Sequence, residues 1–271
     1  MPSERSKKGM EFNMKIKGLL KVIEKIKSDM EGKQNDKKRI RKPKKKFTTT
    51  RTKRGIVGSI EVGTVENCIN KGNISAKGSF VGGISGYTGS FINCVNQGNI
   101  EGVSYIGGIA PLIFGEIKNV SNTGKVYAKG SEAIPAMAGG IAIQIVGTLE
   151  NAYNSGTVEV ENLNNKIGIA GGIVAATAKW QDYIIKYSYN KGEIIGTDKD
   201  ILGNIVGQRM TGSTIENCYY YTESETKGIG SESDDMETKN PVEDTIGVTE
   251  KVEDNIETYE EFLTWIEGKK E

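Results

Sequence analysis

A ten-residue pattern that recurs along the middle of the chain constrains the fold more than any other feature of the sequence. Each copy has an apolar residue at the first place, asparagine at the third (with one exception) and sixth, glycine at the eighth, and Ile or Val at the tenth. The complete copies are Val65–Ile74, Phe91–Ile100, Ile117–Val126, Leu149–Val158 and Ile185–Ile194. A sixth copy begins at Ile215 and departs into tyrosines at 219–221. No complete copy contains an insertion, which indicates that its two apolar ends lie at a fixed structural distance.

A second short motif, Gly-Gly-Ile, completes the repeating unit. It ends at Ile84, Ile109, Ile141 and Ile173, with degenerate versions at Ile56 and at Gly203-Asn204-Ile205. Each unit therefore offers three short β segments, centred on positions such as Ile84, Phe91 and Ile100. One unit cannot bury its few apolar side chains alone, whereas coils stacked about 4.8 Å apart form interior ladders. The pattern predicts an all-β fold, a parallel β-helix or β-solenoid of about five to six coils over residues 55–221.

The three corners of the predicted coil differ in how much they vary. We expect the constant Asn-x-Gly corner to use positive φ angles for a sharp turn. From the tenth place of each copy to the next glycine pair the count is 8, 7, 13, 13 and 9 residues. A further lengthening covers 176–183. Because insertions in solenoids collect on binding faces, we predict that Trp180 and Tyr183 contact a glycan or protein ligand, with tolerated loop drift as the alternative.

Charge is distributed unevenly around this near-neutral body. Residues 1–54 hold 20 Lys/Arg and 6 Asp/Glu, whereas residues 222–271 hold 5 and 16. Residues 37–46 carry eight basic side chains in ten. The segment 33–46 is therefore either a solvated linker or a binding segment for a polyanion such as nucleic acid, anionic lipid or wall polymer. Before it, helical spacing predicts a basic amphipathic helix with an apolar seam of Ile16, Leu19, Ile23, Ile26 and Met30.

The C-terminal part of the chain lacks the repeat. Residues 222–257 are acidic and are predicted to be mostly irregular, extended or disordered. In 258–271, Thr258 and Glu261 have the spacing of a capping box, and large apolar residues follow. We predict a short helix here that covers an exposed end of the solenoid.

No segment of the sequence has the properties of a membrane span or an export signal. None reaches the roughly 18 apolar residues of a transmembrane helix. The apolar stretch 16–23 is broken by lysines, which a signal-peptide core does not tolerate. The sequence therefore gives no standard signal for secretion, and a cytoplasmic location stays open.

The composition argues against several kinds of active site. The chain contains no histidine, which removes histidine bases, histidine metal ligands and Ser-His-Asp triads. The three cysteines, Cys68, Cys94 and Cys218, are too far apart in sequence for a zinc knuckle. A disulfide between the first two on adjacent coils is compatible with the repeat but not required. We predict no catalytic residue, no cofactor and no metal site.

A polysaccharide-degrading β-helix enzyme is the rival to a non-catalytic protein. Such an enzyme needs carboxylates grouped on a groove. Within 55–221 the aspartates are Asp182, Asp198 and Asp200, and Glu193 is the glutamate best placed to join them. The other glutamates fall at outward positions of the repeat, so we predict that the chain is not an enzyme.

Two repeat columns and the glycine strings have structural roles. The third place holds Asn67, Asn93, Asn119, Asn151 and Asn217, with Tyr187 as the exception. We expect a hydrogen-bonding ladder or corner there, because asparagine amides alone are poor metal ligands. The fourth place exchanges cysteine with Val, Ala and Ser, which indicates a buried small side chain. The glycine strings recur in every coil without the Lys-Ser/Thr of a nucleotide-binding loop, so we interpret them as turns.

The repeat resembles a known bacterial repeat family. The string Gly82-Gly83-Ile84-Ser85-Gly86, followed by 93–100, is similar to the GLUG motif, and Glu216–Tyr221 with Lys227–Gly230 looks like the end of such an array. GLUG repeats occur in bacterial surface and secreted proteins, including non-catalytic parts of streptococcal IgA-directed metalloproteases. The resemblance implies a right-handed β-helix-like array outside a bacterial cell with a stalk or adhesive role. The alternative is a structural or phage-associated protein held on a polyanion by its basic N-terminus.

Overall fold

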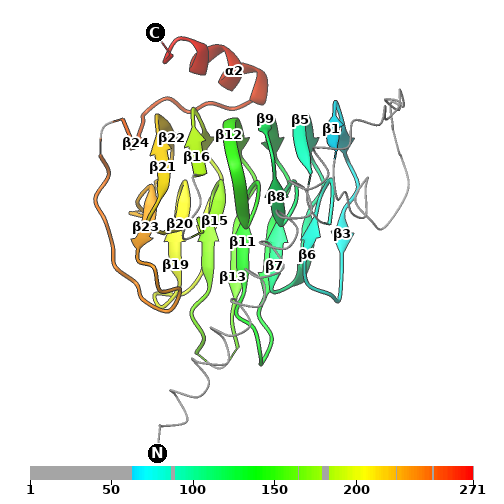
Figure 1. Cartoon of the computed structure of the whole chain (residues 1–271), viewed down its shortest axis with the longest axis vertical. Coiled ribbons are helices and arrows are strands. Elements are labelled where there is room, and N and C mark those ends of the chain that lie inside the picture. The colour runs from blue at the N-terminus through cyan, green and yellow to red at the C-terminus, as the bar shows by residue number, and fades with distance from the viewer. Residues whose placement is uncertain are drawn as a thin grey trace, which may run out of the picture. The chain divides into compact units, whose positions relative to one another are not determined.

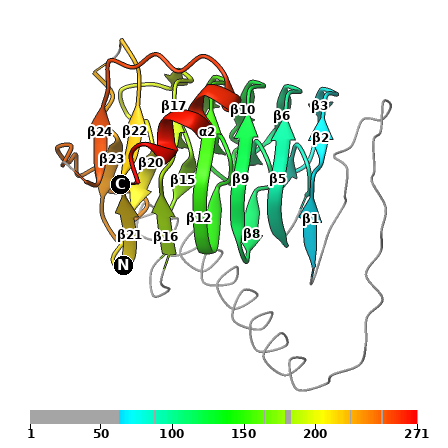
Figure 2. The same cartoon turned by 90° about the horizontal axis from the view of Figure 1, so that it is seen from above.

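The computed structural model describes residues 63–86, 89–163, 165–178, 183–223, 225–245 and 247–270. All the described residues belong to one compact unit, Lys46–Glu271. That unit is a stack of parallel strands from successive coils, as Figures 1 and 2 show, so the predicted all-β solenoid is confirmed. The predicted N-terminal helix, the basic segment 33–46 and the motif at Ile56 lie outside the described residues.

The first sheet carries the first six places of the ten-residue copies. Its eleven strands include the path β1-β5-β9-β12-β17-β22-β24, and its pairings are parallel. Equivalent residues are in register: Phe91 pairs with Ile117, and Ile117 pairs with Leu149. The strands are β1 (Thr64–Glu66), β2 (Ile69–Asn70), β5 (Ser90–Asn96), β8 (Leu112–Phe114), β9 (Ile117–Asn122), β12 (Gln144–Asn154), β16 (Tyr183–Lys186), β17 (Tyr189–Asn190), β21 (Ser213–Glu216), β22 (Cys218–Tyr220) and β24 (Thr249–Lys251).

Two five-stranded sheets complete each coil. One begins at the tenth place of each copy and consists of β3 (Ile74–Ser75), β6 (Ile100–Val103), β10 (Val126–Lys129), β13 (Val158–Glu161) and β18 (Ile194–Ile195). The other consists of β4 (Val81–Gly82), β7 (Tyr105–Gly107), β11 (Met137–Gly139), β14 (Ile169–Gly171) and β19 (Ile201–Gly203). The first four of these strands end at the first glycine of a pair, and β19 ends at Gly203 of the degenerate motif. The segment that we expected to centre on the isoleucine therefore lies just before it.

A fourth sheet was not anticipated from the repeat. It contains β15 (Val174–Ala176), β20 (Val206–Arg209) and β23 (Ile229–Glu232). Both β23 and β24 come from the acidic segment 222–257, which we expected to be mostly irregular. The parallel stack consequently continues past residue 221, where the sequence repeat stops.

The interior of the first sheet is lined by the first and fourth places of the repeat. Phe91, Ile117 and Leu149 are fully buried in the largest apolar cluster, together with Cys94 and Cys218. All three cysteines are free thiols. Burial raises the pKa of Cys94 and of Cys218 to about 12, so these thiols stay protonated at neutral pH. The small residues of the fourth place thus serve as core packing.

A second interior column is a ladder of buried asparagines at the sixth place. The Nδ2 of Asn96 donates to Asn122 Oδ1 at 2.6 Å and to the Gly98 carbonyl at 2.8 Å. Asn122 repeats this with Asn154 at 2.8 Å, and Asn154 with Asn190 at 2.8 Å. At the last step Asn190 donates to Asn204, whose own Nδ2 donates to Thr226 at 2.6 Å. The ladder satisfies polar groups that would be costly to bury unpaired.

Our expectation of positive φ at the Asn-x-Gly corner is wrong. The eighth-place glycines, such as Gly98 and Gly124, are not among the residues with positive φ. They are glycine because coils approach closely there: a Cβ on Gly124 would lie 2.1 Å from the Gly98 oxygen, and one on Gly156 would lie 2.0 Å from the Gly124 oxygen. The glycine is therefore a requirement of coil stacking, not of the backbone angle.

The third place of the repeat supplies the left-handed residue instead. Asn93, Asn119 and Asn151 have φ of 53°, 53° and 56°, and Tyr187 has φ of 50° in the same column. The side chains also form a ladder, with Asn119 donating to Asn93 at 3.1 Å and Asn151 donating to Asn119 at 2.9 Å. The buried Asn151 Oδ1 has no hydrogen-bond partner among the described residues, which fits the loss of an amide donor at Tyr187. The column is thus both a corner and a ladder.

These two roles can be separated at Asn119. We expect Asn119→Gly to cost about 1–2 kcal/mol of unfolding free energy, because glycine keeps the left-handed backbone but leaves the buried Asn151 Nδ2 without its acceptor. Asn119→Ala should cost about 1 kcal/mol more, because alanine is strained at φ 53°. Urea denaturation of both variants measures the difference. Equal midpoints would show that the backbone angle is irrelevant.

The predicted C-terminal helix is present as α2 (Tyr259–Glu267), with the predicted capping box. Thr258 Oγ1 accepts from the Glu261 amide, and the Glu261 carboxylate accepts from the Thr258 amide, both at 3.2 Å. The helix runs along the side of several coils and does not cover an end of the stack (Figures 1 and 2).

Three tyrosines decide this position. Tyr153, Tyr189 and Tyr219 occupy the outward fifth place of consecutive copies and form one cluster with Phe262 and Ile266 of α2. The Tyr153 hydroxyl also donates to the Glu257 carbonyl at 2.9 Å. The apolar face of the helix is thus buried against this tyrosine column on the side of the coils.

Candidate binding site

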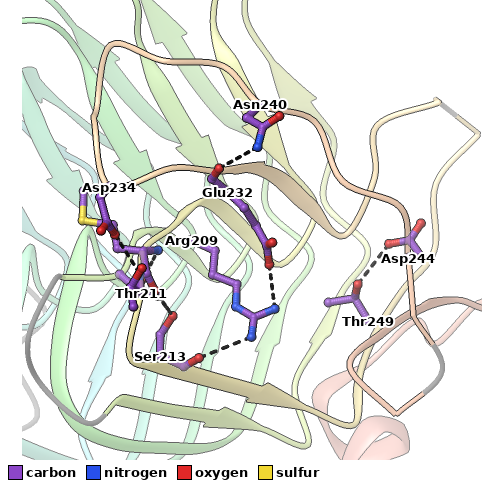
Figure 3. Close-up of polar contacts among 10 residues, drawn as sticks. Arg209, Thr211, Ser213, Glu232, Asp234, Asn240, Asp244 and Thr249 are labelled. Atoms are coloured by element: carbon purple, nitrogen blue, oxygen red, sulfur yellow. Dashed lines mark hydrogen bonds and ion pairs between the residues drawn. The ribbon is translucent and has the colours of Figure 1, made fainter.

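The fourth sheet places an arginine and a glutamate beside each other in the last coils. β20 and β23 are parallel, and their register pairs Arg209 with Glu232. The Arg209 guanidinium donates to Glu232 Oε1 at 2.8 Å and to the Ser213 carbonyl at 3.4 Å (Figure 3). The side chains are 30% and 42% exposed, so the ion pair is open to solvent. Exposed pairs of this kind contribute little to stability.

The loops after these strands hold further polar groups around the pair. Asp234 Oδ1 accepts from the Thr211 amide at 2.9 Å, and Asn240 Nδ2 donates to the Glu232 carbonyl at 3.0 Å (Figure 3). These residues line an open hollow of about 440 Å³, which we call the C-terminal hollow. Its lining is Arg209, Met210, Thr211, Gly212, Ser213, Glu232, Ser233, Asp234 and Asn240.

The polar groups of the C-terminal hollow suit recognition of a polar ligand. Guanidinium and amide groups donate in fixed directions, and carboxylates accept, which is the combination that binds hydroxyl, amide and carboxylate groups. The backbone beneath is fixed, because the buried Gln208 donates from Nε2 to the Ser233 carbonyl at 2.6 Å. A rigid floor lowers the ordering cost of binding.

The residues that we predicted as ligand contacts do not form this hollow. Trp180 lies outside the described residues. Tyr183 is 2% exposed and belongs to the largest apolar cluster, so the expectation of a surface contact there is wrong. In β16, Tyr183 pairs in register with Gly147 and Ser213, and strand alternation turns its ring into the core. Burial accordingly raises its pKa.

The carboxylates named for a polysaccharide-degrading enzyme are not brought together in the described part of the chain. Asp200 is 1% exposed and accepts from the Gly168 amide at 2.6 Å and the Thr197 amide at 2.7 Å. Its carboxylate therefore organises a turn. Asp198 and Glu193 are exposed, and Asp182 lies outside the described residues. Within the ranges described, no three His, Cys, Asp or Glu side chains are grouped to hold a metal ion.

Charged side chains along the coils largely compensate one another. Glu150 lies 3.6 Å from the Lys118 ammonium, 3.8 Å from that of Lys186 and 3.7 Å from that of Lys270. Lysine, glutamate and lysine thus alternate at in-register positions of neighbouring coils, and the chain just after α2 adds a third lysine. This arrangement opposes a slip in register, because like charges would then stack.

Comparisons with known proteins do not assign this chain to a family. No protein-family model matches the sequence, and no curated protein shows significant similarity to it. None of the helices in the described ranges has the length and apolar character needed to cross a membrane.

Sequence reasoning missed the C-terminal hollow although one signal was present. Arg209 is the single arginine of residues 55–221, and it follows the degenerate Gly203-Asn204-Ile205 motif at a variable corner. The residues opposite it, Glu232, Asp234 and Asn240, come from the segment without a repeat. No periodic argument could have placed them against the last coils.

Proposed function

We propose that the chain is a non-catalytic interaction module, a rigid solenoid that presents a polar ligand site at its C-terminal coils. The observation that carries this proposal is the C-terminal hollow, where Arg209, Glu232, Asp234 and Asn240 meet around an open volume of about 440 Å³. Elsewhere the buried asparagines, Asp200 and the cysteines serve packing and inter-coil bonding. The Arg209–Glu232 pair of the hollow is exposed, and exposed ion pairs contribute little to stability.

A surface or secreted location in a bacterium fits this proposal. The resemblance of the repeat to GLUG arrays supports a stalk or adhesive role, with a glycan or a protein as the ligand. Stacked coils make a stiff support in which each unit contacts its neighbours, so a site at one end is held at a defined distance. The proposal thus combines a spacer with a terminal contact site.

Binding to purified peptidoglycan sacculi and to mucin-coated surfaces tests the proposal. We expect Arg209→Ala to weaken binding at least tenfold, about 1.4 kcal/mol, because it removes the directional donor of the hollow. Lys129→Ala is the matched control, since Lys129 also forms an exposed ion pair, with Glu161 at 2.7 Å, and neither residue lines the hollow. Equal binding by both variants would remove the hollow from the proposal, and binding to neither surface would remove the adhesive role.

A second candidate function rests on the basic segment. Eight basic side chains within residues 37–46 favour a structural protein tethered to a polyanion, which counterion release would drive. Deleting residues 33–46 should then abolish salt-dependent binding to DNA or to anionic vesicles. Unchanged binding after this deletion would refute the tether and leave the first proposal untouched.

A further inference from the structure

Cys68 and Cys94 face each other across the first two described coils. The pairings of β1 and β2 with β5 lie on either side of this place, and in them Ile69 is opposite Val95. The same register sets Cys68 opposite Cys94, and the Val95 amide donates to the Cys68 carbonyl at 2.8 Å. Adjacent strands lie about 4.8 Å apart, and the Cα atoms of disulfide-bonded cysteines are roughly 4.4–6.8 Å apart. The fold thus brings these two cysteines within bridging distance.

The hydrogen bonds of the two thiols place them side by side. Cys94 Sγ donates at 3.4 Å to the carbonyl of Val65, which belongs to the coil of Cys68. Cys68 Sγ donates to the Glu66 carbonyl in that same coil, also at 3.4 Å. Burial raises the pKa of Cys68, and a hydrogen bond with the Cys94 thiol opposes this rise. The Cys94 side chain therefore reaches toward the coil that carries Cys68.

The third cysteine has no such neighbour. Cys218 lies in the same column, but the residues opposite it on the coils before and after are Ser188 and Thr249. Valine, alanine and serine fill this place in other coils, so packing alone does not require cysteine. Of the three cysteines in the chain, only Cys68 and Cys94 are in register on adjacent coils.

We propose that Cys68 and Cys94 form a disulfide when an external disulfide, such as oxidised glutathione, acts as the oxidant. Cys68 is 7% exposed and Cys94 is fully buried, so the Cys68 thiolate attacks first. It displaces one thiol and forms a mixed disulfide with the oxidant. The Cys94 thiolate then attacks the sulfur of Cys68, and the second thiol leaves. The pair loses two electrons and two protons, and the external disulfide is reduced to two thiols.

The expected effect of this bond is greater stability of the first two described coils. In a solenoid each coil contacts only its neighbours. A bond between consecutive coils closes the segment 68–94 and restricts the unfolded chain. We expect oxidation to raise the urea midpoint by about 1 M. The oxidising compartment of the proposed surface location favours the bond, but the bond itself requires no ligand.

Incubation of the folded full chain with oxidised glutathione tests the proposal. After removal of the oxidant, alkylation in urea should find one free thiol in place of three, and the mass should fall by that of two hydrogen atoms. Peptide mapping should identify a bond between Cys68 and Cys94 that dithiothreitol reverses. Three free thiols after incubation would overturn the proposal. Glutathione retained on Cys68 as the end product would overturn it as well.

Serine variants separate this bond from other effects of oxidation. Cys218→Ser is the matched control, because it removes the buried cysteine that lacks a cysteine neighbour, and it should keep both the bond and the rise in the urea midpoint. Cys68→Ser and Cys94→Ser should each abolish both, and Ser188 shows that serine fits this place. A rise that persists in these two variants would contradict the proposal. Arg209→Ala should leave the bond unchanged, so a failure of the C-terminal hollow would not count against it.

Discussion

Replacing Gly140 with alanine is expected to remove about 3 kcal/mol or more from the free energy of unfolding. A Cβ at this position would lie 1.9 Å from the Gly172 oxygen of the next coil and 2.6 Å from Asn154 Cγ. Neither neighbour can yield, because one is backbone and the other belongs to the buried asparagine ladder. A total stability of about 5–15 kcal/mol makes this a large fraction. Urea denaturation followed by circular dichroism measures the loss.

Gly78→Ala is the matched control for Gly140→Ala. A Cβ on Gly78 meets no described atom within 4 Å. Surface substitutions without new contacts usually change stability by less than about 0.5 kcal/mol. If the two alanine variants unfold at the same urea concentration, close approach between coils does not explain the repeated glycines.

Asn122→Ala is the second change for which we expect a large effect, about 3 kcal/mol of lost stability. The Asn122 side chain is fully buried, accepts from Asn96 at 2.6 Å, and donates to Asn154 and to the Gly124 carbonyl, both at 2.8 Å. Alanine removes three buried hydrogen bonds, and Asn154 Oδ1 and the Gly124 carbonyl lose the donor that Asn122 supplied. A buried polar group without a partner costs about 1–3 kcal/mol. The asparagine ladder therefore predicts a loss well above that of one hydrogen bond.

Two further variants test the reason for this loss. Asn73→Ala removes an exposed asparagine that accepts one bond, from the Asn99 amide at 2.9 Å, and should cost less than about 1 kcal/mol. Asn122→Asp keeps the shape but replaces the amide donor with a carboxylate. Burial favours its protonated form, so its stability relative to wild type should rise as pH falls from about 7 to about 4. A flat pH dependence would contradict a buried, donor-dependent ladder.

The repeat in the sequence predicted most of the fold, because every coil has the same spacing of apolar residues, asparagine and glycine. The fixed spacing between places such as Phe91 and Ile100 predicted parallel strands in register, and the structure confirms this register in β5 and β6. The capping-box residues predicted α2 because helix starts depend on near neighbours in the chain. The sequence could not show why the eighth place is glycine, since the clashing oxygen belongs to another coil.

Candidate binding residues were harder to predict than the fold. Tyr183 was expected on a surface corner, but the register of its strand places the ring in the core. The sequence could not show this, because burial of one aromatic ring depends on contacts with residues distant in the chain. Arg209 and Glu232 become neighbours through β23, whose segment has no repeat and no periodic signal.

The sequence by itself determined a stacked, parallel, all-β body with a short C-terminal helix and a chemistry without histidine. These properties follow from the composition and from a local spacing that recurs in every repeat. The tertiary structure alone decided where the helix lies, which asparagines form the interior ladder, which glycines are required by stacking, and which polar groups meet in the C-terminal hollow. The physical reason is that these features depend on contacts between coils, and a contact between residues far apart in the chain leaves no local pattern in its sequence.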